Sequence, residues 1–152
     1  MATEIQRITD QFHRAWNGDA WHGPPVAVIL ASIDARTAAW KPTPGTHSIR
    51  ELAAHIAVWL DTARRRLAGE DYQPGAADWF IEPAEKWPDT VQRLGRTWMA
   101  LVSLIEKTPE ARLAETMPGQ SYTGYVLLHG VLQHSLYHAG QIAQLRRIAS
   151  EQ

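Results

Sequence analysis

The stretch Leu127–Leu145, LLHGVLQHSLYHAGQIAQL, decides the fold that we predict for this chain. Its apolar residues recur at helical spacing. At 100° per residue, four of them fall in one narrow sector: Leu127, Val131, Ile142 and Leu145. His134 and His138, four residues apart, lie in the same sector, one helical turn from each other. The pattern therefore predicts a long helix whose buried stripe contains two imidazoles.

Two adjacent imidazoles in an apolar stripe need polar partners, because a buried ring nitrogen without one costs free energy. A shared metal ion would be such a partner. The HxxxH spacing alone is weak evidence, since a chain with seven histidines has such a pair by chance in roughly a quarter to a third of cases. The metal hypothesis therefore requires a third ligand from another helix.

His55 is the candidate for that third ligand. It lies in a second periodic stretch, residues 48–69, which opens with Ser48 and Glu51 at the spacing of a capping box. His55 borders the apolar stripe of this stretch, which contains Ile49, Ala53, Ile56, Leu60 and Ala63. We therefore predict a metal site formed by His55, His134 and His138.

Two more stretches have helical periodicity. Residues 3–16 carry an apolar face, and a third long helix begins with Asp89 as its cap and closes at Pro109. A short apolar piece, Val26–Ile33, also favours a helix, and Ser121 or Thr123 can start the last long helix, which runs to about Ala149. No repeat or pair of strands is visible, so we predict an all-α four-helix bundle comprising a single domain, residues 1–152.

The connections between these helices are long. About 30 residues separate the first long helix from the second, and about 19 separate the second from the third, more than tight antiparallel neighbours need. Long crossover connections, as in up-up-down-down bundles, account for these lengths. The second connection, Glu70–Pro88, carries Trp79, Phe80 and Trp87. It is either a lid over a pocket or a loop anchored by its aromatic residues, and we favour the anchored loop.

Composition excludes several classes of protein. The net charge is −1 without a basic block, which argues against a nucleic-acid partner. The chain has no cysteine, hence no disulfide, no thiolate nucleophile and no cysteine-based zinc site. No apolar run approaches the roughly 20 residues of a membrane span. The polar first residues lack a signal segment, so we expect a cytoplasmic location.

Three motifs of this chain resemble those of the DinB-like (DinB/YfiT) superfamily: WNGDAWHG at 16–23, HSIRELAAHIAVW at 47–59 and LHGVLQHSLYHAGQIAQLRR at 128–147. The resemblance implies a four-helix bundle, often dimeric, with a divalent metal held by three histidines. Matched residue by residue, these are His55, His134 and His138, the triad that spacing also indicates. Relatives include thiol S-transferases that use low-molecular-weight thiols and a thiol-dependent isomerase, while many members have no assigned reaction.

Three neutral imidazoles suit zinc or nickel best, although iron, manganese and copper remain possible. Three protein ligands leave one coordination position open, as in catalytic zinc sites. The metal could activate a low-molecular-weight thiol or a water molecule. The glutamate of an HExxH protease motif is absent, because the residues between His134 and His138 are SLY. A thiol S-transferase acting on a small molecule is the leading hypothesis. The alternatives are a metal-dependent hydrolase and a non-catalytic, metal-binding dimeric stress protein.

The other candidate residues receive structural roles. His129 lies on the opposite side of its helix from His138, and His47, His13 and His22 lack a partner at ligand spacing. Gln141 could hydrogen-bond a metal-bound ligand or be an ordinary polar residue. We expect core packing for Trp59, stacking between helices for Tyr137, and a solvated helix end for Arg64–Arg66.

Overall fold

The computed structural model describes residues 1–151. Its helices are α1 (Glu4–Asn17), α2 (Val26–Ala31), α3 (Ala35–Ala39), α4 (Ile49–Leu67), α5 (Trp87–Lys107) and α6 (Gly124–Ala149), with 3-10 turns η1 (Gly75–Ala77) and η2 (Glu110–Ala114). Within residues 1–151 there is no strand, and one isolated bridge joins Thr116 to Thr123. The predicted all-α fold is therefore confirmed.

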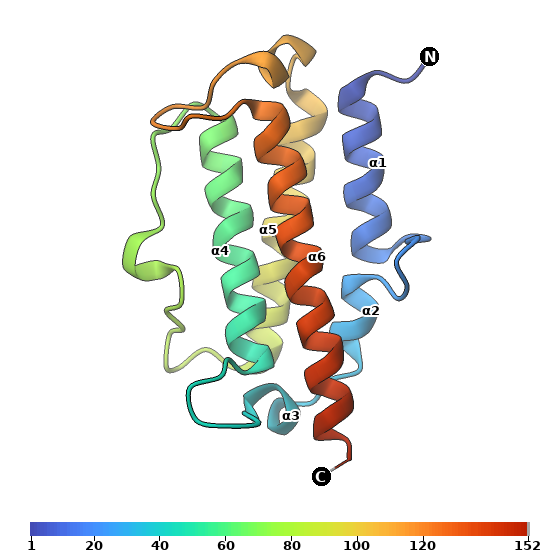
Figure 1. Cartoon of the computed structure of the whole chain (residues 1–152), viewed down its shortest axis with the longest axis vertical. Helices are drawn as coiled ribbons and strands as arrows, with labels where there is room; N and C mark the ends of the chain where they lie inside the picture. Colours follow the sequence, from blue (N-terminus) through green and yellow to red (C-terminus); the bar gives the residue numbers. More distant parts are fainter. Residues whose placement is uncertain (152) are drawn as a thin grey trace.

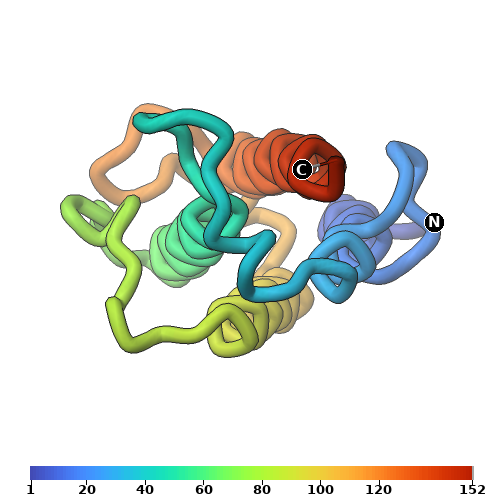
Figure 2. Tube along the Cα trace, turned by 90° about the horizontal axis from the view of Figure 1, so that it is seen from below, coloured from blue at the N-terminus to red at the C-terminus, as the bar shows by residue number. Residues whose placement is uncertain are grey.

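The four long helices α1, α4, α5 and α6 form a bundle (Figure 1). Viewed along the bundle, α4 lies beside both α5 and α6. Helix α1 lies on the other side of α5 and α6, away from α4 (Figure 2). Helices α4 and α5 run in one direction, and α1 and α6 run in the other (Figure 1). None of the helices described is long and apolar enough to cross a membrane.

The long connections have two different causes. Helices α4 and α5 run parallel, so residues 68–86 must return along the bundle, which is the crossover that the sequence predicts (Figure 1). Helices α1 and α4 run in opposite directions, and their connection is long because it contains α2 and α3. The order of directions thus differs from the up-up-down-down order suggested by the connection lengths.

The core is closed by large apolar side chains from all four long helices. Phe12, Leu60, Trp98 and Leu128 are completely buried. Each such side chain contributes about 1.5–3 kcal/mol by leaving water. The indole of Trp98 also donates a hydrogen bond to the carbonyl of Phe12 at 3.2 Å, so its polar atom is satisfied inside the core.

The ends of the long helices follow the predicted signals with one exception. Ser48 and Glu51 form the capping box at the start of α4, and Thr123 caps α6. Helix α5, however, begins at Trp87 and not after Asp89. Asp89 is its third residue, and its carboxylate accepts from the backbone N–H of Lys86 at 3.2 Å. Trp87 is buried and donates to the carbonyl of Ile33, which fixes the earlier start.

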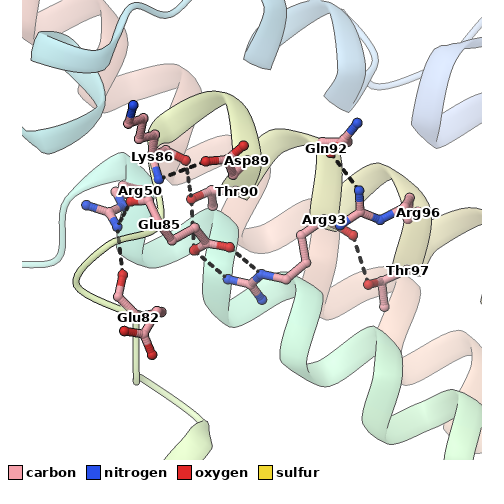
Figure 3. Close-up of polar contacts among 10 residues, drawn as sticks. All are labelled: Arg50, Glu82, Glu85, Lys86, Asp89, Thr90, Gln92, Arg93, Arg96 and Thr97. Carbon is pink, nitrogen blue, oxygen red and sulfur yellow. Dashed lines mark hydrogen bonds and ion pairs between the residues drawn. The ribbon is translucent and has the colours of Figure 1, made fainter.

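The connection 68–86 is anchored at its far end by polar contacts (Figure 3). Arg50 of α4 donates to the carbonyls of Glu82 and Glu85. The carboxylate of Glu85 accepts two hydrogen bonds from Arg93 of α5, at 2.7 and 3.0 Å. Phe80 is exposed. The loop is thus anchored as predicted, but salt bridges and backbone contacts contribute as well as aromatic side chains.

Candidate metal centre

Three histidines converge between α4 and α6. His55 comes from α4, and His134 and His138 come from successive turns of α6. The Nε2 atom of His134 lies 3.0 Å from Nε2 of His55 and 3.1 Å from Nε2 of His138. The three possible ligand atoms lie within 4.8 Å of one another. The structure therefore brings together the three residues that the sequence singles out.

The other ring nitrogen of two of these histidines faces an oxygen acceptor. Nδ1 of His55 lies 2.7 Å from the Asp78 carboxylate and 3.2 Å from the Asp78 carbonyl. Nδ1 of His138 lies 2.6 Å from the side-chain oxygen of Gln141. Because these acceptors require a donor, both rings carry their proton on Nδ1 and turn the lone pair of Nε2 toward the centre.

This arrangement suits a metal cation. Two Nε2 lone pairs face the same Nε2 of His134, which can donate one proton at most, so hydrogen bonds alone cannot satisfy the three nitrogens. Nitrogens bound to one zinc ion at about 2.0–2.1 Å in tetrahedral geometry would lie roughly 3.3–3.4 Å apart, a little farther than the two separations observed. Nδ1 of His134 is buried without a partner among the described residues. With a cation at Nε2, that atom would carry the ring's proton.

The surroundings of His134 and His55 favour the neutral form of their imidazoles, which is the form that binds a metal cation. Burial, together with the smaller effects of the neighbouring His138 and His55, lowers the pKa of His134 to about 4. Burial also lowers the pKa of His55, against the opposing effect of Asp78. Since metal ligation requires neutral imidazoles, these shifts favour binding near pH 7.

Two tryptophans wall the histidines. The indole of Trp79, in the 68–86 connection, lies between two imidazoles, with its ring centroid 3.8 Å from that of His55 and 3.7 Å from that of His47. The indole of Trp59 donates to the carboxylate of Asp78 at 2.8 Å. His47 lies outside the cluster of three histidines and supports the ring that covers His55.

A cavity of about 380 Å³ opens beside the triad, between α4 and α6. His55 and His134 form one end of it, and Arg66 and Tyr122 also line it. The residues between them are mainly apolar or small: Trp59, Ala63, Val126, Leu127, Gly130 and Val131. Both the volume and the lining are typical of a small-molecule site.

The structure extends some predicted roles and changes another. Trp59 packs against the core, as predicted, and it also lines the cavity. Tyr137 is 66% exposed and does not pack between helices, because its position on α6 faces outward. The side-chain oxygen of Gln141 contacts Nδ1 of His138, a partner that the sequence did not suggest. His129 stacks on Tyr125, away from the triad, as predicted.

Two residues of this region were absent from the predicted site. Asp78 lies in a connection without periodicity, so no sequence spacing relates it to His55. Arg66 was assigned to a solvated helix end but is only 4% exposed. Its position on the helix could have indicated this, because at 100° per residue it lies about 20° from His55 around α4.

The model of the DinB superfamily matches residues 26–142 of the chain. This range covers well over half of the chain and includes all three histidines. No curated protein matches the chain. The chain therefore belongs to the DinB superfamily.

Proposed function

We propose that this DinB-superfamily chain is a metal-dependent enzyme of thiol S-transferase type, with one divalent ion held by His55, His134 and His138. The observation that supports it most strongly is the orientation of the three rings. Their Nε2 atoms face one another, and the Nδ1 atoms of His55 and His138 face oxygen acceptors. Zinc or nickel suits three neutral imidazoles best, and iron, manganese and copper also accept them.

The triad has no fourth protein ligand. Within residues 1–151, no further His, Asp or Glu joins the cluster. The nearest carboxylate, Asp78, already accepts from Nδ1 of His55 and from the indole of Trp59. A structural metal tie would be closed by a fourth ligand, whereas a catalytic site keeps a position open. The adjacent cavity supports the catalytic alternative over a non-catalytic metal protein.

A divalent ion at this position would supply Lewis acidity, which lowers the pKa of a thiol or a water molecule. The chain's own residues orient the site. Asp78 and Gln141 hold the rings of His55 and His138 in one tautomer. Trp79 covers His55 and restricts the access of water on that side.

Thiol transfer is favoured over hydrolysis because it depends less on a general base. Among the described residues that line the cavity, Asp78 is the sole carboxylate, and His55 and Trp59 both contact its Oδ1 atom. Hydrolysis usually needs a base to accept a proton from water. A thiol has a lower pKa than water, so it needs less help to reach the reactive anion.

The small-molecule partner would be a low-molecular-weight thiol together with an electrophile. We also propose a homodimer, since apolar side chains remain exposed on the outer face of α6, among them Tyr125 and Tyr137. Sedimentation at micromolar concentration tests this point, and a clean monomer would contradict it.

The activity test uses the purified chain loaded with zinc or with nickel. Each form is incubated with glutathione or cysteine and the electrophile monobromobimane, and the metal-dependent rate of thioether formation is measured by fluorescence. We expect a rate above the uncatalysed reaction that His134→Ala removes and His129→Ala retains. Equal rates for wild type, His134→Ala and buffer would contradict the transferase proposal without contradicting metal binding.

A further inference from the structure

The end of the cavity opposite the triad contains a buried positive charge. Arg66 is 4% exposed and lines the cavity. Its guanidinium donates to the carbonyl of Tyr72 at 2.9 Å, the side-chain oxygen of Gln73 at 2.8 Å and the hydroxyl of Tyr122. All three acceptors are neutral. No carboxylate of residues 1–151 lies within salt-bridge distance of Arg66, so its charge is stabilised by these dipoles and by the ring of Trp59, whose centroid lies 5.8 Å from Cζ.

The neighbouring arginines differ from Arg66. Arg64 and Arg65 are half-buried at the surface, and each forms a salt bridge with Asp61, at 2.7 and 2.9 Å. The most deeply buried of the three guanidinium groups is thus the one without an anionic partner. Buried charges are normally paired, because desolvation costs several kcal/mol per ion. An anion in the cavity would supply the missing partner.

We propose that Arg66 binds the carboxylate of the molecule that occupies this cavity. Of the five N–H groups of a guanidinium, three are used by Tyr72, Gln73 and Tyr122. One N–H remains on each terminal nitrogen. Two donors of this kind match the two oxygens of a carboxylate.

The distance between Arg66 and the triad sets the length of the ligand. The indole of Trp59 lies between them, with its ring centroid 5.7 Å from that of His134 and 5.8 Å from Cζ of Arg66. At most the sum of these two distances separates the guanidinium carbon from the imidazole. A carboxylate bound to Arg66 can therefore belong to a molecule whose other end reaches the triad across the face of Trp59.

The middle of the cavity accepts an apolar body. Trp59 and Ala63 of α4 and Val131 of α6 line it, and the carboxylate of Asp78, which also lines the cavity, accepts from Trp59 and lies against His55. Gly130 lies in this middle section, and a Cβ atom added there would meet no atom within 4 Å. The substrate class is thus a short, apolar carboxylate with its reactive group at the far end. The statement that this molecule reacts at the triad rests on the proposed function. The binding of its carboxylate by Arg66 does not, because that contact needs no metal.

Arg66 also connects α4 with Tyr72 and Gln73 of the 68–86 connection, so a purely structural role must be distinguished. Hexanoate and hexanamide serve as probes, because they differ in charge but hardly in size. Their dissociation constants are measured by isothermal titration calorimetry at pH 7.5, on the metal-loaded chain and again after chelation. We expect wild type to bind hexanoate at least tenfold more tightly than hexanamide in both forms.

Variants assign the preference to its residue. Arg66→Gln should bind the two probes equally, while Arg65→Gln, the matched arginine paired with Asp61, should keep the wild-type preference. Gly130→Leu fills the middle of the cavity and should weaken both probes at least tenfold. Gly140→Leu is its control on α6, because a Cβ there also meets no atom within 4 Å and Gly140 does not line this cavity.

Three results would overturn the proposal: no preference for hexanoate in wild type, equal loss in Arg65→Gln, or unchanged binding in Gly130→Leu. The results for wild type and for Gly130→Leu do not depend on the Arg66 variant. The proposal can therefore be contradicted even if Arg66→Gln does not fold. A preference that appears only in the metal-loaded chain would also overturn it, by assigning the carboxylate to the metal. A chain that binds hexanoate through Arg66 but holds no metal would contradict the proposed function alone.

Discussion

The carboxylate of Asp78 lies 2.7 Å from Nδ1 of His55. This contact joins the 68–86 connection to α4 at the edge of the triad. It fixes the ring of His55 with its Nε2 lone pair toward His134 and His138, and it adds a negative charge that makes the imidazole a better ligand. The connection is thus a part of the candidate site and not only a link between helices.

Asp78→Asn should weaken metal binding by about tenfold, and Asp78→Ala by up to about a hundredfold, the range measured when such supporting groups are removed. Asparagine keeps an acceptor but loses the charge, which explains the order. Competition with a chromophoric chelator gives the dissociation constants. Glu82→Gln is the control, because Glu82 is exposed in the same connection and only its backbone carbonyl makes a contact. Equal affinities for wild type and Asp78→Ala would refute this role.

Gln141 has the corresponding role for His138, with a neutral acceptor at 2.6 Å. Gln141→Ala should therefore weaken metal binding by a smaller factor than Asp78→Ala, roughly threefold to tenfold. Gln141→Glu should restore or increase affinity, because a carboxylate is the stronger acceptor. The same chelator competition measures both, with the exposed Gln144→Ala as control. A larger loss in Gln144→Ala than in Gln141→Ala would show that this contact does not matter.

Acid should destabilise the metal-free chain through His134. Its pKa is about 4 in the folded chain, because of burial and its histidine neighbours, and near the ordinary value of about 6.5 when unfolded. Between these two pH values the unfolded chain binds more protons, so the free energy of unfolding falls as pH is lowered through that window. This contribution of His134 to the free energy of unfolding is fully present above about pH 6.5 and amounts to about 3 kcal/mol.

Urea denaturation of the chelated protein at pH 7.5, 6, 5 and 4.5 measures this dependence. His134→Gln should flatten the loss between pH 6.5 and 4.5 relative to wild type, whereas the exposed His22→Gln should not. Identical pH dependence in wild type and His134→Gln would mean that His134 does not resist protonation in the folded chain.

The anchor at the far end of the connection can be tested separately. Glu85 accepts from Arg93 and Thr90, and the Arg93 guanidinium lowers the pKa of the Glu85 carboxyl. Glu85→Gln should release this end of the connection, lowering stability by about 1–2 kcal/mol and increasing hydrogen exchange in residues 78–86. Glu82→Gln again serves as the control. Unchanged hydrogen exchange in Glu85→Gln would contradict this role of the Glu85 carboxylate. The connection would then be anchored by the hydrogen bonds from the Arg50 side chain to the carbonyls of Glu82 and Glu85.

The helical fold and the three histidines could be predicted because the signals are local. Periodicity places His134 and His138 on one face of successive turns, and the capping box at Ser48 fixes the register of the helix that carries His55. Both patterns depend on neighbours within a few residues. The helix directions could not be predicted in the same way, because the length of a connection does not show whether it contains short helices such as α2 and α3.

The supporting residues could not be predicted, because they depend on tertiary packing. Asp78 reaches His55 through a connection that folds back along α4 and carries no repeat of its own. Arg66 belongs to a run of three arginines whose composition indicates a solvated end, yet its angle on α4 places it in the cavity. The composition of the run suggested exposure to solvent for Arg66, whereas its angle on the helix would have suggested a position in the cavity.

Metal content of the purified chain tests the central claim most directly. Elemental analysis at pH 7.5 should find about one divalent ion per wild-type chain, and far less in His55→Ala, His134→Ala and His138→Ala, because two imidazoles hold an ion much less well than three. His129→Ala should keep full content, since its ring stacks on Tyr125 away from the triad. Below about pH 4 wild type should lose metal as His134 becomes protonated. Full content in His55→Ala, or no divalent metal in wild type, would contradict the account.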